Sequence, residues 1–121
     1  MNVKELIQKS LIEIIEEIQT TKQMIIENKY EKIQNEYAQA QFEKKVKGDI
    51  ANVVDDKQKA VFSNQEKREI EFVNRTELDN DYKMLKDFNQ NLNRQKDDLY
   101  LNLEVLEKVF ETKKLEMELS K

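Results

Sequence analysis

Hydrophobic residues recur at helical spacing along two long stretches of the chain. The first stretch runs from about residue 3 to residue 46, and its stripe begins at Ile7, Leu11, Ile14 and Ile18, with steps of four and three residues. After a step of eight residues, one more than a heptad, the same rhythm returns, and we expect the stripe to drift around the helix there. The resumed stripe comprises Ile26, Tyr30, Ile33, Tyr37 and Ala40.

The second stretch runs from about residue 77 to residue 119, and its steps alternate four and three throughout, which is a heptad a/d pattern. Three positions of this seam are polar. Asn89 at such a position is typical of a residue that fixes register, and Lys96 would extend toward water or pair with a carboxylate. Alternatively, this part of the seam faces water because the first helix drifts away. The seam comprises Leu78, Tyr82, Leu85, Asn89, Leu92, Lys96, Leu99, Leu103, Leu106, Phe110, Lys113 and Met117.

The connecting segment, residues 47–76, contains the only glycine near its start. Gly48 followed by Asp49 could end one helix and cap the next, or the helix could continue through Gly48 at a cost of roughly 1 kcal/mol. The spacing of Ile50, Val53, Val54 and Val61 then predicts a short helical stripe.

Later in the connection, Ser63 and Glu66 fit a capping box, with Phe62 as a hydrophobic staple. They predict a helix over 64–73, followed by a break at 74–76 in which Thr76 caps the last helix. We therefore expect one or two short helices between the long ones.

Neither long helix can bury its apolar stripe alone. We therefore expect an all-α fold in one domain over residues 1–121: an elongated antiparallel helical hairpin, or coiled coil, with the short helices at its tip. In a two-helix hairpin a wide apolar face would remain exposed to solvent, so we expect the middle segment or a partner chain to pack against it. We also expect a homodimer or a higher oligomer. Parallel pairing between copies is the alternative arrangement.

Composition supports helices and excludes most other folds. The 121 residues include one Gly and no Pro, and sheet folds need many turns built from these residues. Charged residues make up 38% of the chain, which fits either an extended helical protein or a disordered one, and the apolar spacing favours helix. The net charge of −4 offers no basic excess for a phosphate backbone.

Two residue types that are common in catalytic sites are missing. The chain has no His and no Cys, and it has no glycine-rich loop that would cradle a phosphate. Neighbouring carboxylates such as Asp55 and Asp56, or Asp97 and Asp98, would diverge by about 100° on a helix and are interpreted as solvated. We expect no enzyme activity, no cofactor and no metal site. Without a signal peptide or an apolar span, we expect a cytoplasmic protein away from membranes.

One weaker pattern involves nucleic acid. Basic residues lie near Phe42 and Phe62, and such interleaving can bind single strands by stacking and phosphate contact. Because acidic residues match them nearly one for one, ordinary surface lysines are the competing interpretation. The candidate contacts are Lys44, Lys45, Lys47, Lys57, Lys59, Lys67 and Arg68.

Residues 40–118 resemble a loose group of small helical phage proteins. The similarity lies in SNQEKREIEFVNRTELDNDYKMLKDF and in NLNRQKDDLYLNLEVLEKVFETKKLEME, where a cap and a short helix precede a long apolar-periodic helix. In that group the gene often lies beside a single-strand annealing recombinase, and no activity is established. The chain has residues 74–76 where the group tends to have an Asp-Pro turn.

Three functional hypotheses follow. The first is a non-enzymatic protein that binds other proteins by helix-on-helix contact, as a phage-type accessory in DNA recombination or host takeover. The second is a module that binds single-stranded nucleic acid through the lysine-rich middle segment. The third is an inhibitor of a host defence nuclease, with the acidic last helix occupying a nucleic-acid channel.

Overall fold

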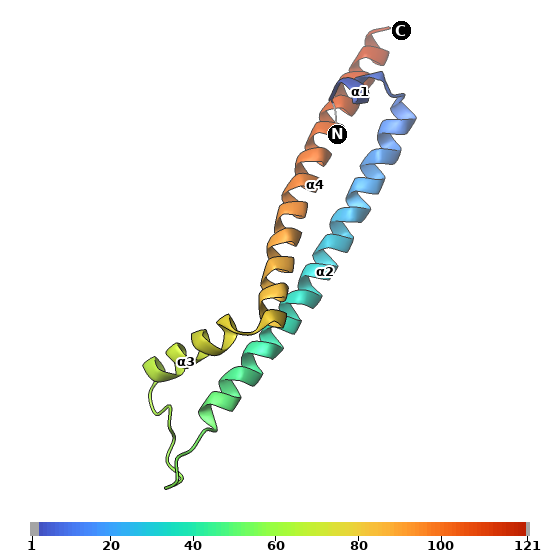
Figure 1. Ribbon diagram of the computed structural model, residues 1–121. Coiled ribbons are helices and arrows are strands. Elements are labelled where there is room, and N and C mark those ends of the chain that lie inside the picture. The colour runs from blue at the N-terminus through green and yellow to red at the C-terminus, as the bar shows by residue number, and fades with distance from the viewer. Residues whose placement is uncertain (1–2, 121) are drawn as a thin grey trace. The chain divides into compact units, whose positions relative to one another are not determined.

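A computed structural model describes residues 3–120 as four helices and their connections. The helices are α1 (Val3–Gln8), α2 (Leu11–Ala51), α3 (Gln65–Glu77) and α4 (Asn80–Leu119) (Figure 1). The fold is the all-α hairpin that the sequence predicts, since α2 and α4 pack against each other. The chain divides into two compact units. Unit 1 joins the chain up to Glu31 to the chain from Leu92 onward, and unit 2 is Lys32–Asn91.

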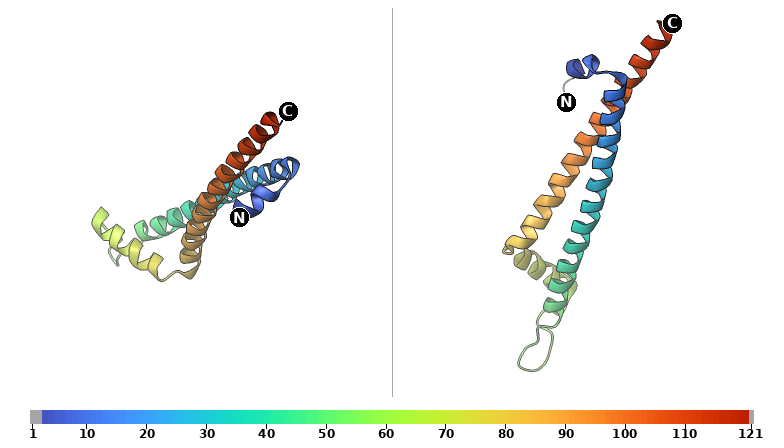
Figure 2. Two further views of the ribbon diagram at one scale, coloured as in Figure 1. Left: turned by 90° about the horizontal axis from the view of Figure 1, so that it is seen from above. Right: turned by 90° about the vertical axis from the view of Figure 1, so that its right-hand side faces the viewer.

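Unit 1 is organised around a small apolar core contributed by three helices. Leu6 of α1, Ile14 of α2 and Leu106 and Val109 of α4 are buried together. Figure 2 shows α1 turned sharply away from the axis of α2, which brings the side chain of Leu6 into this core. Three partly buried side chains pack against the cluster, namely Ile18, Val105 and Phe110.

The predicted first helix, residues 3–46, differs from the structure at both ends. It is interrupted after Gln8, and α2 begins at Leu11 with Ser10 as its cap, since the Ser10 Oγ accepts a hydrogen bond from the Glu13 backbone N–H at 3.3 Å. At the other end, α2 continues through Gly48 to Ala51. The Asn52 N–H donates to the Gly48 carbonyl at 3.1 Å, so Gly48 does not end the helix.

In unit 2, the caps of α3 and α4 each lie close to the predicted positions but on other residues. The Asn64 side chain, and not that of Ser63, accepts from the Lys67 N–H at 2.8 Å. Residues 74–76 belong to α3, and the Thr76 hydroxyl donates back to the Phe72 carbonyl at 2.8 Å. The predicted break at 74–76 is therefore wrong. Helix α4 instead begins after Asp79, whose Oδ1 accepts from the Tyr82 N–H at 3.0 Å.

The connection between α2 and α3, residues 52–64, reverses the chain without a helix. The predicted helical stripe at Ile50, Val53, Val54 and Val61 is therefore wrong, since Ile50 belongs to α2 and the three valines lie in the connection. Val54 and Ala60 form an isolated antiparallel bridge. The Asp55 Oδ1 accepts from the backbone N–H groups of Lys57 and Lys59, both at 2.9 Å. Gln58 takes a positive φ of 63°, which lets the chain reverse without a glycine.

Candidate helix–helix interaction surface

The inward face of α4 follows the heptad seam over most of its length. Leu92, Leu99 and Leu106 are buried in unit 1, and Tyr82 is buried in unit 2. The two ends of the predicted seam point elsewhere, since Leu78 is 85% exposed and Met117 is 55% exposed. The remaining seam positions are half-buried: Leu85, Asn89, Lys96, Leu103, Phe110 and Lys113.

The inward face of α2 begins with the predicted residues and then departs from them. Leu11 and Ile18 are half-buried and Ile14 is fully buried, whereas Ile7 lies in α1 with 59% of its surface exposed. Beyond Ile18 the inward positions keep the steps of three and four, but most of them are polar. They are Thr21, Ile25 and Asn28 in unit 1, and Lys32, Asn35 and Gln39 in unit 2.

In unit 1 the polar contact is made by Asn28, which is only 3% exposed. Its Nδ2 donates to the Leu92 carbonyl of α4 at 3.0 Å and to the Gln95 Oε1 at 3.2 Å. Its Oδ1 is buried without a hydrogen-bond partner. A buried amide that is half satisfied costs stability, and it also fixes the register in which the two helices meet.

In unit 2 the polar contacts form a connected chain between α2 and α4. The Asn89 Nδ2 donates to the Gln39 Oε1 at 2.5 Å, and the Gln39 Nε2 donates to the Glu43 Oε1 at 3.2 Å. The Tyr82 hydroxyl donates to the same Glu43 oxygen at 2.6 Å. Beside this chain, the Asn35 Nδ2 donates to the Leu85 carbonyl at 3.0 Å. Asn89 therefore faces α2, and not water.

The pairing of Tyr82 with Glu43 shifts both acids. Burial, followed by the hydrogen bond to Glu43, raises the pKa of Tyr82 from 10.0 to about 12. The donated hydrogen bond from Tyr82 is the main cause that lowers the pKa of Glu43 from its usual value of 4.5. The Tyr82 ring is held between Phe42, stacked at 5.2 Å, and Phe72, edge-on at 6.5 Å.

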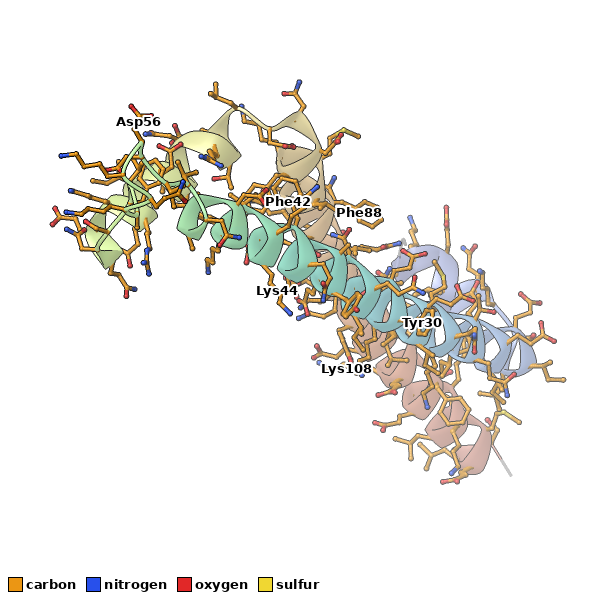
Figure 3. The ribbon with its side chains drawn as sticks, turned by 90° about the horizontal axis from the view of Figure 1, so that it is seen from below. Tyr30, Phe42, Lys44, Asp56, Phe88 and Lys108 are labelled. Carbon is orange, nitrogen blue, oxygen red and sulfur yellow. The ribbon has the colours of Figure 1, made fainter. Side chains whose placement is uncertain are left out.

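The apolar residues that were expected to continue the α2 stripe face solvent instead. Ile26, Tyr30, Ile33 and Tyr37 are each between 59% and 67% exposed, and Ala40 is also exposed. Their steps of four, three and four place them on one side of the uninterrupted helix α2 (Figure 3, where Tyr30 is labelled). We call Ile26, Tyr30, Ile33 and Tyr37 the α2 apolar face. The expectation that these residues pack against the last helix is wrong, because Ile25 and a row of polar side chains occupy the side of α2 that faces α4.

The candidate nucleic-acid contacts lie in unit 2 on three separate segments. Lys44, Lys45 and Lys47 belong to α2, Lys57 and Lys59 to the connection, and Lys67 and Arg68 to the first turn of α3. The aromatic rings that base stacking would need are engaged within the protein. Phe42 stacks on Tyr82, and the guanidinium of Arg75 lies 6.0 Å from the centre of the Phe62 ring.

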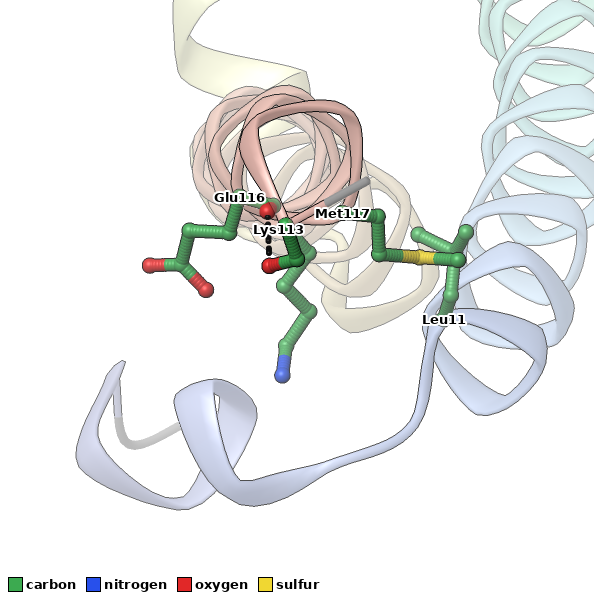
Figure 4. A pocket seen from close by; sticks show the side chains of 5 residues that line it. Leu11, Lys113, Glu116 and Met117 are labelled. Atoms are coloured by element: carbon green, nitrogen blue, oxygen red, sulfur yellow. Dashed lines mark hydrogen bonds between the residues drawn. The ribbon is translucent and has the colours of Figure 1, made fainter.

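A pocket of about 490 Å³ lies in unit 1 between the start of α2 and the end of α4, lined by Leu11, Lys113, Glu116, Met117 and Ser120 (Figure 4). The Lys113 amine donates to the Ile7 carbonyl near the end of α1, where a cation meets unpaired helix carbonyls. This contact gives the polar seam residue Lys113 a structural role in holding α1.

Within residues 3–120, no group of three or more acidic side chains is arranged to hold a metal ion, and no helix is long and apolar enough to cross a membrane. The sequence matches no protein-family model, and no curated protein or solved structure is significantly similar to it.

Proposed function

We propose that this protein is a non-enzymatic interaction protein that binds another helical surface through the α2 apolar face. The supporting observation is that α2, beyond Ile18, turns mostly polar side chains toward α4 and leaves the four residues of the α2 apolar face in water. A helix that only served to complete a hairpin would gain more from burying Ile26, Tyr30, Ile33 and Tyr37. Contiguous exposed apolar residues of this kind mark protein-binding surfaces.

The biological setting is a separate part of the proposal. A role as a phage-type accessory in DNA recombination or host takeover rests on the resemblance of residues 40–118 alone. Binding of single-stranded nucleic acid and inhibition of a nuclease remain predictions. A salt titration of oligonucleotide binding would test the first of these, because electrostatic affinity is greatest at low salt.

The test of the proposed function is affinity capture from a lysate of the source organism with three matched baits. The first bait is the wild-type chain, the second carries Ile33→Glu on the α2 apolar face, and the third carries Ala38→Glu at an exposed position of α2 outside that face. We expect a protein that wild type and Ala38→Glu retain and Ile33→Glu loses. Equal capture by all three baits, or by none, would contradict the proposal.

A further inference from the structure

Building on the proposed function, we propose that the occupant of the α2 apolar face is a second copy of this chain. The two copies dock with their α2 helices antiparallel, around a two-fold axis that passes between Tyr30 and Ile33. Lys29 of each copy then pairs with the partner's Glu36. Closed two-fold contacts of this kind use the same surface patch on both subunits.

The order of large and small side chains fits the antiparallel arrangement. Along the face the sequence runs Ile26, Tyr30, Ile33, Tyr37, so it alternates isoleucine and tyrosine. In the antiparallel pairing each Tyr30 meets the partner's Ile33, and each Tyr37 meets the partner's Ile26. In a parallel pairing the tyrosines would meet each other in the same layers, as would the isoleucines. Layers that match a large side chain with a smaller one keep the helices evenly spaced.

Charges beside the face favour the same arrangement. Lys29 and Glu36 are one heptad apart, so they lie on the same flank of the face, and both are exposed. In an antiparallel pair this flank meets itself in reverse order, which brings Lys29 to the partner's Glu36 twice. On the other flank Glu27 meets the partner's Gln34, so like charges are not opposed. A parallel pair would instead place Lys29 beside a neutral glutamine.

The contacts of Lys29 and Glu36 within one chain are loose. The Lys29 Nζ lies 5.8 Å from the centre of the Tyr100 ring, and the Glu36 carboxylate lies 3.9 Å from the Lys32 Nζ. Exposed contacts of this length contribute little stability. Re-pairing the two side chains across a dimer therefore breaks no strong bond of the single chain.

The contact that α2 makes with α4 leaves the face free. On a helix, successive residues are about 100° apart, so Ile26 and the buried Asn28 point in nearly opposite directions. A second copy can therefore cover the face without disturbing the polar contacts of Asn28.

The decisive experiment exchanges the two charges. Lys29→Glu gives a chain with two acidic flank residues, and Glu36→Lys gives one with two basic flank residues. Sedimentation equilibrium in the micromolar range measures the dimer dissociation constant. We expect this constant to be at least about tenfold larger for each single variant than for wild type, because like charges meet twice. We expect an equimolar mixture of the two single variants to form a heterodimer, and the double variant Lys29→Glu/Glu36→Lys to dimerise like wild type. Lys83→Glu, on the exposed surface of α4, is the control and should not change dimerisation.

Cross-linking fixes the orientation, since the chain contains no cysteine and each introduced thiol is unique. By the same register, Gln23 meets the partner's Ala40. Oxidation of a mixture of Gln23→Cys and Ala40→Cys chains should therefore give mainly the mixed disulfide. A predominance of same-site disulfides would show a parallel pair and overturn the inference.

The outcomes separate this inference from the proposed function. A wild-type chain that stays monomeric throughout the micromolar range overturns the second copy as occupant, whereas a partner captured in an Ile33-dependent way would still support the proposed function. A dimer that Ile33→Glu leaves unchanged overturns the second copy as the occupant of this face. If that variant also captures the same proteins as wild type, the proposed function fails as well.

Discussion

The two units use segments of the same two helices, but they hold those segments together in different ways. In unit 1 the central contact is apolar, with Leu6, Ile14 and Leu106 each at most 1% exposed. In unit 2 apolar packing at Ile50 and Tyr82 is joined by a hydrogen-bonded chain that runs from Asn89 through Gln39 and Glu43 to the Tyr82 hydroxyl. Apolar burial is non-directional, whereas hydrogen bonds between half-buried side chains form in one register only. The clustered apolar core therefore lies in unit 1, and the polar contacts fix the register of the helices.

The largest expected effect comes from emptying the apolar core. Leu106→Ala removes a fully buried side chain and should lower the free energy of unfolding by about 2–5 kcal/mol. Urea unfolding followed by far-UV circular dichroism measures this change. The control is Leu101→Ala, a 59% exposed leucine on the same helix, which should have little effect. An equal loss from both substitutions would contradict the assignment of the core.

A smaller effect is expected from the hydrogen-bond chain of unit 2. Tyr82→Phe keeps the aromatic packing but removes the donor to Glu43, and should cost about 1.5 kcal/mol near neutral pH. The wild type should also lose stability at both ends of the pH range. The contribution of Tyr82, whose pKa is raised, is present below pH 10 and lost as the pH rises toward about 12. The contribution of Glu43, whose pKa is lowered, is present above about 4.5 and lost as the pH falls below it.

Thermal unfolding of wild type and Tyr82→Phe across this pH range checks the assignment. The difference in stability between the two proteins should be largest near neutral pH and should shrink toward both extremes. A difference that is constant with pH would show that the hydroxyl acts independently of ionisation.

The polar contact in unit 1 should behave in the opposite sense. Asn28→Leu removes a buried amide oxygen that has no partner, while Gln95 is exposed and can bind water instead. We expect the free energy of unfolding to rise by about 1 kcal/mol, because an amide at a seam position fixes the register of the helices but lowers their stability. Chemical unfolding measures the gain. A substantial loss would mean that the two hydrogen bonds of Asn28 outweigh its unsatisfied oxygen.

The smallest effect concerns Gly48, which lies inside α2 with nothing within 4 Å of the position where a Cβ would be. Gly48→Ala should stabilise the protein by about 0.5–1 kcal/mol through helix propensity alone. If the substitution destabilised the protein, the helix would not continue through this position in solution.

The regular helix α4 shows how far sequence spacing reaches. Its seam alternates strictly, and the structure places the positions from Tyr82 to Lys113 toward α1 and α2 within their units. The first part of α2 behaves in the same way at Leu11, Ile14 and Ile18. In these segments the apolar residues stand at the inward positions of the helix, so the apolar pattern predicts correctly which residues face the partner helix.

The second part of α2 shows why apolarity alone fails. From Ile18 the prediction followed the next clear apolar run and stepped eight residues to Ile26, whereas the helix geometry steps seven to Ile25. The polar seam residue Asn89 indicates that the inward side of α2 also carries polar residues, because a polar group on one helix needs a polar partner on the other. The cap at Ser10 was also visible, since Ser10 and Glu13 have capping-box spacing. Asn64 and Asp79 are harder to choose from sequence, because other capping residues lie next to them.

The most direct test of the account uses two adjacent isoleucines of α2. Ile25 is 6% exposed and Ile26 is 59% exposed. Because the chain has no cysteine, Ile25→Cys and Ile26→Cys each introduce a single thiol. In dilute solution, where the chain is dissociated, the thiol at position 26 should react with an alkylating reagent faster than the thiol at position 25, on the order of tenfold or more. The thiol at position 26 should become protected as the protein concentration rises. Equal rates at the two positions, or faster reaction at position 25, would contradict the claim that α2 packs through the side that carries Ile25 and Asn28 and leaves the α2 apolar face exposed.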